Sequence, residues 1–185
     1  MDDFQKIIKK LQNRGIEFET GLSNQEISVA EELYDFSFPA EMKALFSVAL
    51  PVTEGFYNWR NFEAANILKI KTAFKMPLRG LLFDLRHNAL WCDNWGMRPA
   101  ENSEVVQIFM RYYKDAPRMI PIYSHRYMPS ISNEKKSPVF SIMQSDIICY
   151  GTDLIEYLEL EFGFKEYSDF DDAEIEHIKF WCDLL

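Results

Sequence analysis

The sequence has few of the residues that usually mark a catalytic centre or a metal site. Its seven glycines are scattered singly, so no glycine-rich phosphate loop is present, and no G-x-S-x-G elbow of a serine hydrolase occurs. The three histidines (His87, His125 and His177) are isolated, and the three cysteines include no C-x-x-C pair, so the clustered ligands of a zinc site are absent. The sequence therefore predicts a protein that is not an enzyme and that binds no metal or other cofactor.

Long apolar segments are also missing. No apolar run approaches the roughly 20 residues that span a bilayer. The N-terminal segment is amphipathic and charged, and it lacks the apolar centre and the cleavage site of a signal peptide. An odd number of cysteines without a pairing pattern is typical of reduced thiols that pack as small apolar side chains. These features predict a cytoplasmic protein that does not bind a membrane.

Basic residues are scarce at the C-terminal end of the chain. The 185 residues include 29 acidic and 20 basic side chains, which gives a net charge of −9. Residues 1–150 hold 18 of each sign, whereas residues 151–185 hold 11 acidic residues against Lys165 and Lys179. This distribution argues against nucleic acid as a direct partner, because phosphate contacts need clustered basic residues. It is compatible with a basic protein partner; the alternative is an acidic face that only keeps the protein soluble.

Hydrophobic periodicity predicts an α+β fold in a single domain, residues 1–185. Helical patterns or helix-start signals occur in the segments 4–15, 23–33, 39–49, 64–74, 103–110 and 175–185, and in the segment that follows residue 150. A short alternating strand covers residues 16–20. Two β-prone runs, Met119–Tyr127 and Val139–Tyr150, flank a polar connection, and within the second run we expect neighbouring strands at Val139–Ile142 and Ile147–Tyr150. We expect N-terminal helices packed on a small, mainly antiparallel central sheet, with C-terminal helices closing the domain.

The segment from Arg118 to Phe162 resembles a known family. Its runs IPIYSHRY-P, PVFS…DII-YG and DL-xx-YL, at residues 120–129, 138–151 and 153–158, are similar to bacterial members of the SUKH superfamily, relatives of the fungal cell-wall (glucan) synthesis regulators. Weaker matches precede it at residues 22–46, and the run GLLFD…HN…WG…RP begins at Gly80. The resemblance covers about residues 22–162 and leaves 163–185 as an acidic C-terminal helical extension.

This resemblance implies a single α+β domain that binds a partner without catalysis. Many bacterial members of the superfamily look like immunity proteins, which neutralise polymorphic toxins, often nucleases, by tight binding. We therefore expect an immunity protein whose partner is a basic toxin domain. The alternative is a regulatory or scaffold protein of the kind found among the cell-wall (glucan) synthesis regulators.

One set of candidate partner contacts lies in the first β-prone run. Tyr123, His125 and Tyr127 alternate, so on a single strand they share one face of the sheet, with Arg126 on the other. That face is either packed or a half-exposed polar platform. Arg126 is expected to pair with a carboxylate, and Asp84 and Asp146 are the candidates.

A second set combines an aromatic residue with the acidic extension. Trp95 lies beside Gly96 and is a candidate anchor, whereas Trp91 is expected in the core. The acidic candidates cluster before and in the first turn of the expected terminal helix: Asp169, Asp171, Asp172 and Glu174. No residue is predicted to be catalytic or to bind a metal.

Overall fold

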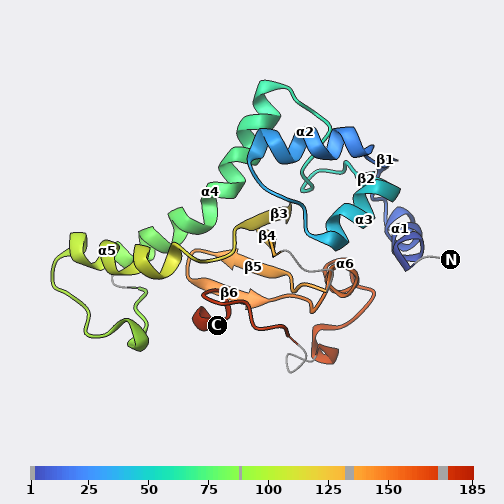
Figure 1. Cartoon of the computed structure of the whole chain (residues 1–185). Helices are drawn as coiled ribbons and strands as arrows, with labels where there is room; N and C mark the ends of the chain where they lie inside the picture. The colour runs from blue at the N-terminus through green and yellow to red at the C-terminus, as the bar shows by residue number, and fades with distance from the viewer. Residues whose placement is uncertain (1–2, 88, 132–135, 171–174) are drawn as a thin grey trace.

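A computed structural model describes residues 3–87, 89–131, 136–170 and 175–185 of the chain (Figure 1). These residues form the expected α+β domain, with a two-stranded and a four-stranded antiparallel sheet. The α-helices are α1 (Asp3–Asn13), α2 (Asn24–Tyr34), α3 (Ala40–Val48), α4 (Ala64–Arg86), α5 (Asn102–Tyr113) and α6 (Leu154–Glu161). The strands are β1 (Phe18–Thr20), β2 (Ala49–Pro51), β3 (Met119–Tyr123), β4 (Arg126–Pro129), β5 (Phe140–Met143) and β6 (Asp146–Cys149). Of the helices in these ranges, none is long and apolar enough to cross a membrane.

The N-terminal helices form where local signals predict them. α1 buries Ile7, Ile8 and Leu11 on one face, as its periodicity requires. α2 opens with a complete capping box: Ser23 Oγ accepts from the backbone N–H of Glu26 at 3.2 Å, and the Glu26 carboxylate accepts from the N–H of Ser23 at 2.8 Å.

The two β-prone runs each fold into a hairpin. The second hairpin confirms the neighbouring strands predicted at Val139–Ile142 and Ile147–Tyr150. The prediction of one strand through Tyr123, His125 and Tyr127 is wrong. Ser124 and His125 form the turn between β3 and β4, because Ser124 adopts a left-handed conformation with φ 48°. Tyr123 pairs with Arg126 across this turn, and Tyr127 pairs with Pro121. The four-stranded sheet has the simple order β3-β4-β5-β6, with every neighbouring pair antiparallel.

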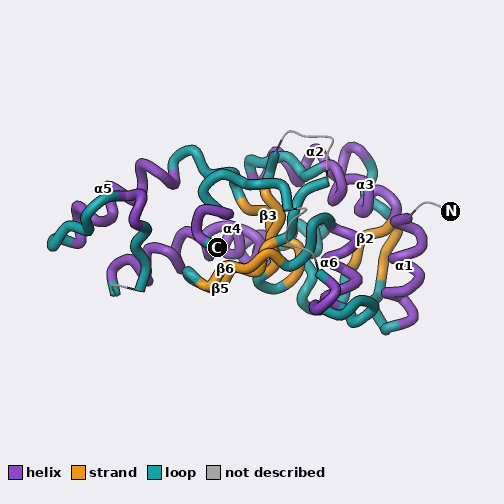
Figure 2. The backbone as a smooth tube through the Cα atoms, turned by 90° about the horizontal axis from the view of Figure 1, so that it is seen from below, coloured by secondary structure: helices purple, strands orange, loops and turns teal. Residues whose placement is uncertain are grey.

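Both faces of the four-stranded sheet are covered. One face contributes Ile120, Ile122, Met128 and Val139 to a core shared with α1, α2, α3 and α6. The other contributes Met119, Tyr127, Phe140, Ile142 and Ile147 to a second core, which contains the C-terminal half of α4, α5 and the end of the chain. Figures 1 and 2 place α1 and α5 at opposite ends of the molecule, with the sheet between them.

Helix α4 is longer than the sequence predicts and connects the two cores. Its 23 residues continue through Pro77 and Gly80, beyond the predicted end near Phe74. Proline lacks the N–H that would bond to the carbonyl of Ala73 four residues earlier. The hydroxyl of Tyr127 donates to that carbonyl instead, at 3.3 Å.

The predicted terminal helix at residues 175–185 is wrong. Residues 175–178 have no regular secondary structure, and a turn leads into a short 3-10 helix, Cys182–Leu184. Phe180 is left-handed, with φ 74°, and its N–H donates to the Asp183 carboxylate at 2.9 Å. The buried Trp181 donates from Nε1 to the carbonyl of Pro117 at 2.8 Å. These tertiary contacts outweigh the helical periodicity of the segment.

Candidate binding groove

A groove of about 600 Å³ opens where the turns of both hairpins meet α4. Its walls come from the loop before α4, from the middle of α4 and from the two hairpins of the large sheet. The lining residues are Tyr57, Met76, Gly80, Ser124, His125, Tyr127, Ile142, Met143 and Gln144.

The loop before α4 holds the first hairpin turn. The N–H of Ser124 donates to the carbonyl of Gly55 at 2.8 Å, and the hydroxyl of Tyr57 donates to the carbonyl of Ser124 at 2.7 Å. Gly55 has φ +102°, and a Cβ atom there would lie 2.3 Å from the ring of Tyr123. Glycine is therefore required for this loop to reach the turn.

Helix α4 holds the second hairpin turn. The carboxylate of Asp84 is buried and accepts from the N–H of Ser145 at 2.9 Å and from its hydroxyl at 2.6 Å. Gly80 lets the same turn approach the helix closely, since a Cβ atom there would lie 2.8 Å from Cα of Gln144. Both walls of the groove are thus fixed by specific contacts.

The groove contains strained backbone in both turns. Ser124 has φ 48° and Gln144 has φ 60°, and neither residue is glycine. A left-handed conformation costs a residue with a Cβ atom on the order of 1–2 kcal/mol. Such strain is concentrated at functional positions in many proteins.

His125 lies at the polar end of the groove, and Arg126 contacts it from outside the groove lining. Nη1 of Arg126 contacts Nε2 of His125, and because a guanidinium can only donate, Nε2 must accept. The proton of neutral His125 therefore lies on Nδ1, which faces Ser124 Oγ at 3.2 Å. Burial lowers the pKa of His125, and the nearby positive charge of Arg126 lowers it further.

Arg126 pairs with Glu161 on α6, so the prediction of Asp84 or Asp146 as its partner is wrong. Its Nε lies 2.8 Å from the Glu161 carboxylate, and its Nη1 donates to Ser141 Oγ at 2.8 Å. The two charged side chains are only 12% and 16% exposed. The reason for the different partner is topological: Arg126 lies on the sheet face covered by α6, whereas Asp84 belongs to α4 on the opposite face.

The structure separates the aromatic residues predicted to contact a partner. Tyr127 lies at the groove, buried, and burial raises the pKa of its hydroxyl. Tyr123 lies on the other face of the sheet, with ring centroids 4.8 Å from Phe56 and 5.6 Å from Phe162. Trp95 is buried in the second core, 5.4 Å from the ring of Trp91. Of these three, only Tyr127 lines the groove.

Of the acidic candidates, the structure describes Asp169, which does not line the groove. Asp169 is exposed at the end of a short 3-10 helix, Tyr167–Asp169. Asp171, Asp172 and Glu174 lie outside the described residues.

Sequence reasoning missed most of the groove lining. Met76 and Gly80 were not assigned to a helix, because Pro77 and Gly80 usually end one. Met143 and Gln144 lie in the turn expected between the strands of the second run, but nothing in the sequence indicates that this turn packs beside α4. The one available signal was that Met76, Gly80 and Phe83 have helical spacing.

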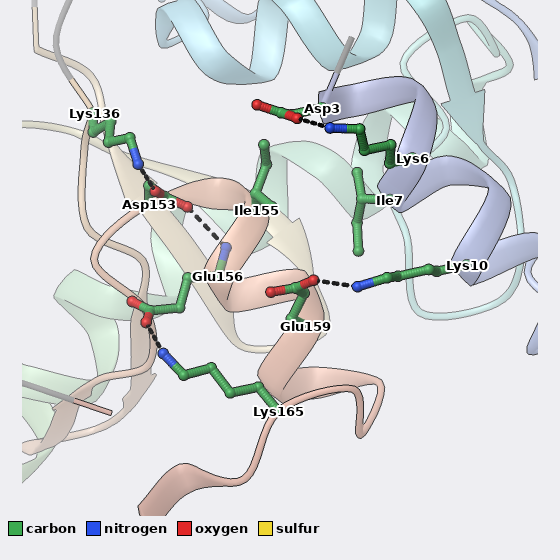
Figure 3. A pocket seen from close by; sticks show the side chains of 10 residues that line it. All are labelled: Asp3, Lys6, Ile7, Lys10, Lys136, Asp153, Ile155, Glu156, Glu159 and Lys165. Carbon is green, nitrogen blue, oxygen red and sulfur yellow. Dashed lines mark hydrogen bonds and ion pairs between the residues drawn. The ribbon is translucent and has the colours of Figure 1, made fainter. Parts of the chain in front are cut away.

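A second hollow, of about 310 Å³, lies between α1 and α6 (Figure 3). Its lysines all point to carboxylates: Lys6 to Asp3 at 2.7 Å, Lys10 to Glu159 at 2.5 Å, Lys136 to Asp153, and Lys165 to Glu156. The hydrogen bond to Asp153 raises the pKa of Lys136. Four lysines thus neutralise four carboxylates around this hollow, which we call the seam between α1 and α6. Three of these carboxylates belong to the acidic excess that the sequence shows after residue 150.

No cation site accompanies these hollows in the described part of the chain, where no three His, Cys, Asp or Glu side chains are placed to hold a metal ion. No protein-family model matches the chain, and no significant match was found among curated proteins or solved structures. The resemblance to a family therefore depends on the sequence alone, chiefly on the runs at residues 120–129, 138–151 and 153–158. Any proposal about function depends on these runs and on the groove.

Proposed function

We propose that the chain is a non-catalytic binding protein that neutralises a cognate toxin by direct contact, like the immunity proteins of the SUKH superfamily that it resembles. The groove between α4 and the two hairpin turns is the observation that carries the proposal. Most of its first hairpin and all of its second lie inside the runs at residues 120–129 and 138–151 that carry the resemblance.

The surface around the groove suits a protein partner. Met76 and Phe83 of α4 and Met143 of the second hairpin are 49%, 50% and 58% exposed. Exposed methionine and aromatic side chains supply apolar contact area, and methionine adapts its shape to a partner. Tyr57, Ser124 and His125 add polar groups at one end. An apolar surface with a few polar groups at its edge is the usual composition of a protein interface.

The rigidity of the groove also supports a binding role. Ser124 and Gln144 take the positive φ that a two-residue hairpin turn requires at its first central position, although neither is glycine, and contacts from Gly55 and Asp84 hold both turns. Surfaces that are already ordered lose less entropy when a partner docks, so such rigidity can favour affinity. Binding without catalysis needs no more than this arrangement.

The proposal is tested with the protein encoded by the neighbouring reading frame. If that frame encodes a toxin, the purified chain should form a stoichiometric complex with it and abolish its activity. Met143→Glu should weaken the complex by about tenfold or more, because a charge would be desolvated in an apolar contact. Met97→Glu is the matched control, since Met97 is 95% exposed and does not line the groove.

Two outcomes would contradict the proposal. Equal affinity of the Met143→Glu and Met97→Glu variants would remove the groove from the interface. A gene located among envelope-synthesis genes, with no toxin beside it, would favour the regulatory scaffold instead.

A further inference from the structure

Helix α4 carries a row of basic residues that form no ion pair with any residue that the structure describes. Lys71, Lys75 and Arg79 are spaced four residues apart, so they lie on one face, and Arg86 follows two turns later. Among the described residues, no carboxylate lies within ion-pairing distance of any of the four. Like charges at this spacing destabilise a helix. Ion pairs among the described residues therefore do not account for this row.

Several basic residues elsewhere in the chain pair with carboxylates. Lys10, Lys136 and Lys165 each pair with a carboxylate in the seam between α1 and α6 (Figure 3). Arg60 binds Glu19 and Glu26. In a chain of net charge −9, the exposed surface of α4 is therefore locally basic.

An apolar row runs beside the basic one. Met76, Gly80 and Phe83 have the spacing i, i+4, i+7, so they lie on one face of α4. Met76 directly follows Lys75 in the sequence, and Gly80 directly follows Arg79. Met76 and Gly80 line the groove, and Met76 and Phe83 are exposed. The basic row therefore borders the open side of an apolar groove.

We infer that α4 and the groove dock an acidic, amphipathic segment of a protein partner. The apolar side chains of this segment enter the groove beside Met76 and Met143, and its carboxylates pair with Lys75 and Arg79. The inference rests on the proposed function and specifies which part of the toxin is recognised. Charge complementarity fixes the sign: the acceptor surface is basic, although the chain as a whole is acidic.

Three described carboxylates lie near this row, and none forms an ion pair with it. Asp35 is exposed and lines a hollow with Lys71 and Lys75, beside the cation of Arg118. Asp84 is buried and bonded to Ser145, so it does not face a ligand. Asp146 is exposed opposite Met143 and is a single charge. The acidic residues of α6 that favoured a basic partner are engaged in ion pairs, among them Glu156, Glu159 and Glu161.

The test uses a synthetic helical peptide with Leu and Phe at positions i, i+4 and i+7 and Glu on the remaining face. A second peptide replaces each Glu by Lys. Fluorescence anisotropy should show binding of the Glu peptide and none of the Lys peptide. The double variant Lys75→Glu/Arg79→Glu should bind the Glu peptide at least about tenfold more weakly, because two attractions become repulsions.

The matched control is Lys9→Glu/Lys114→Glu, which changes the net charge equally at two exposed positions outside α4. It should stay within about twofold of the original affinity, because these charges are not part of the docking surface. Circular dichroism establishes that both variants are folded. Equal loss of affinity in the two variants, or equal binding of both peptides, would overturn the inference.

Other ligands are separate outcomes. The chain is also tested with a single-stranded DNA oligonucleotide and with vesicles of phosphatidylcholine and phosphatidylglycerol. If either binds more tightly than the Glu peptide and the α4 variant loses that binding, this ligand, and not a protein segment, is what the surface recognises. Concentration-dependent dimers lost in the same variant would assign the surface to a second copy of the chain. If the α4 variant neutralises the toxin normally, the inference fails and the proposed function stands. If the original chain binds the Glu peptide but no toxin, the proposed function fails alone.

Discussion

The proline inside α4 gives the hydroxyl of Tyr127 a structural role that can be measured. Pro77 leaves the carbonyl of Ala73 without its helical donor, and Tyr127 Oη donates to that carbonyl at 3.3 Å. Tyr127→Phe removes this donor in a buried setting. An unsatisfied buried carbonyl costs about 1–3 kcal/mol. The bond is longer than most O–H···O bonds, so we expect a loss near the low end, about 1 kcal/mol.

Tyr157 provides the matched comparison. Its side chain is fully buried, and its hydroxyl has no hydrogen-bond partner among the described residues. Tyr157→Phe deletes the same atom but relieves a desolvated polar group, so the free energy of unfolding should stay equal or rise by up to about 1 kcal/mol. The same chemical change thus has opposite expected signs at two buried positions.

Thermal unfolding followed by circular dichroism measures both variants. For a chain of this size, 1 kcal/mol corresponds to a shift of about 2–4 °C in the melting temperature. We expect Tyr127→Phe to melt earlier than the original protein, and Tyr157→Phe at the same temperature or later. Equal losses in the two variants would show that the hydroxyl of Tyr157 has a partner, and the reasoning from hydrogen-bond satisfaction would fail.

Three further predictions concern charge. Glu161→Gln should lower the free energy of unfolding, measured with urea, by about 3 kcal/mol, because it leaves Arg126 charged and largely buried. Adding Arg126→Met should recover much of the lost stability, whereas additive losses in the double variant would refute this reasoning. Lys75→Glu should raise stability by roughly 1 kcal/mol, since cations flank it four residues away on both sides; a lower melting temperature would contradict that. Hydrogen bonds from the Arg60 guanidinium and from the backbone and side chain of Ser23 lower the pKa of Glu26 to about 2 from its usual 4.5. The stability that the ionised Glu26 carboxylate contributes is therefore complete above pH 4.5 and is lost as the pH falls toward 2. Glu26→Gln should flatten the pH dependence of stability in that window, and an unchanged slope would count against it.

Local signals were sufficient for much of the fold. The capping box at Ser23 and the apolar face of α1 predicted their helices, because both depend on residues within one or two turns. The second hairpin was predicted, since its two strands are separate β-prone segments around a polar turn. The first turn was missed, because Ser124–His125 is not a common turn pair. Contacts distant in sequence, from Gly55 and Asp84, hold the two turns.

Helix limits failed where tertiary contacts outweigh local preference. Pro77 normally ends a helix, yet α4 continues because the proline is buried and Tyr127 satisfies the released carbonyl. In the last residues the opposite occurs, since buried Trp181 and its bond to Pro117 hold a segment whose periodicity is helical. His125 and Tyr127 were predicted to lie together at a binding surface, and both line the groove. The reason given for this was wrong, because a turn at Ser124–His125 interrupts the predicted strand.

Charge is the property for which sequence order and spatial arrangement differ most. The excess of acidic residues after Tyr150 predicts an acidic binding surface only if those side chains remain exposed without partners. Glu159 instead pairs with Lys10 and Glu161 with Arg126, across long sequence separations. Each such pair neutralises one acidic and one basic side chain, whereas the basic side chains of α4 remain exposed. The sign of the net charge therefore does not determine the sign of the binding surface, and a partner selected by complementarity to α4 would be acidic.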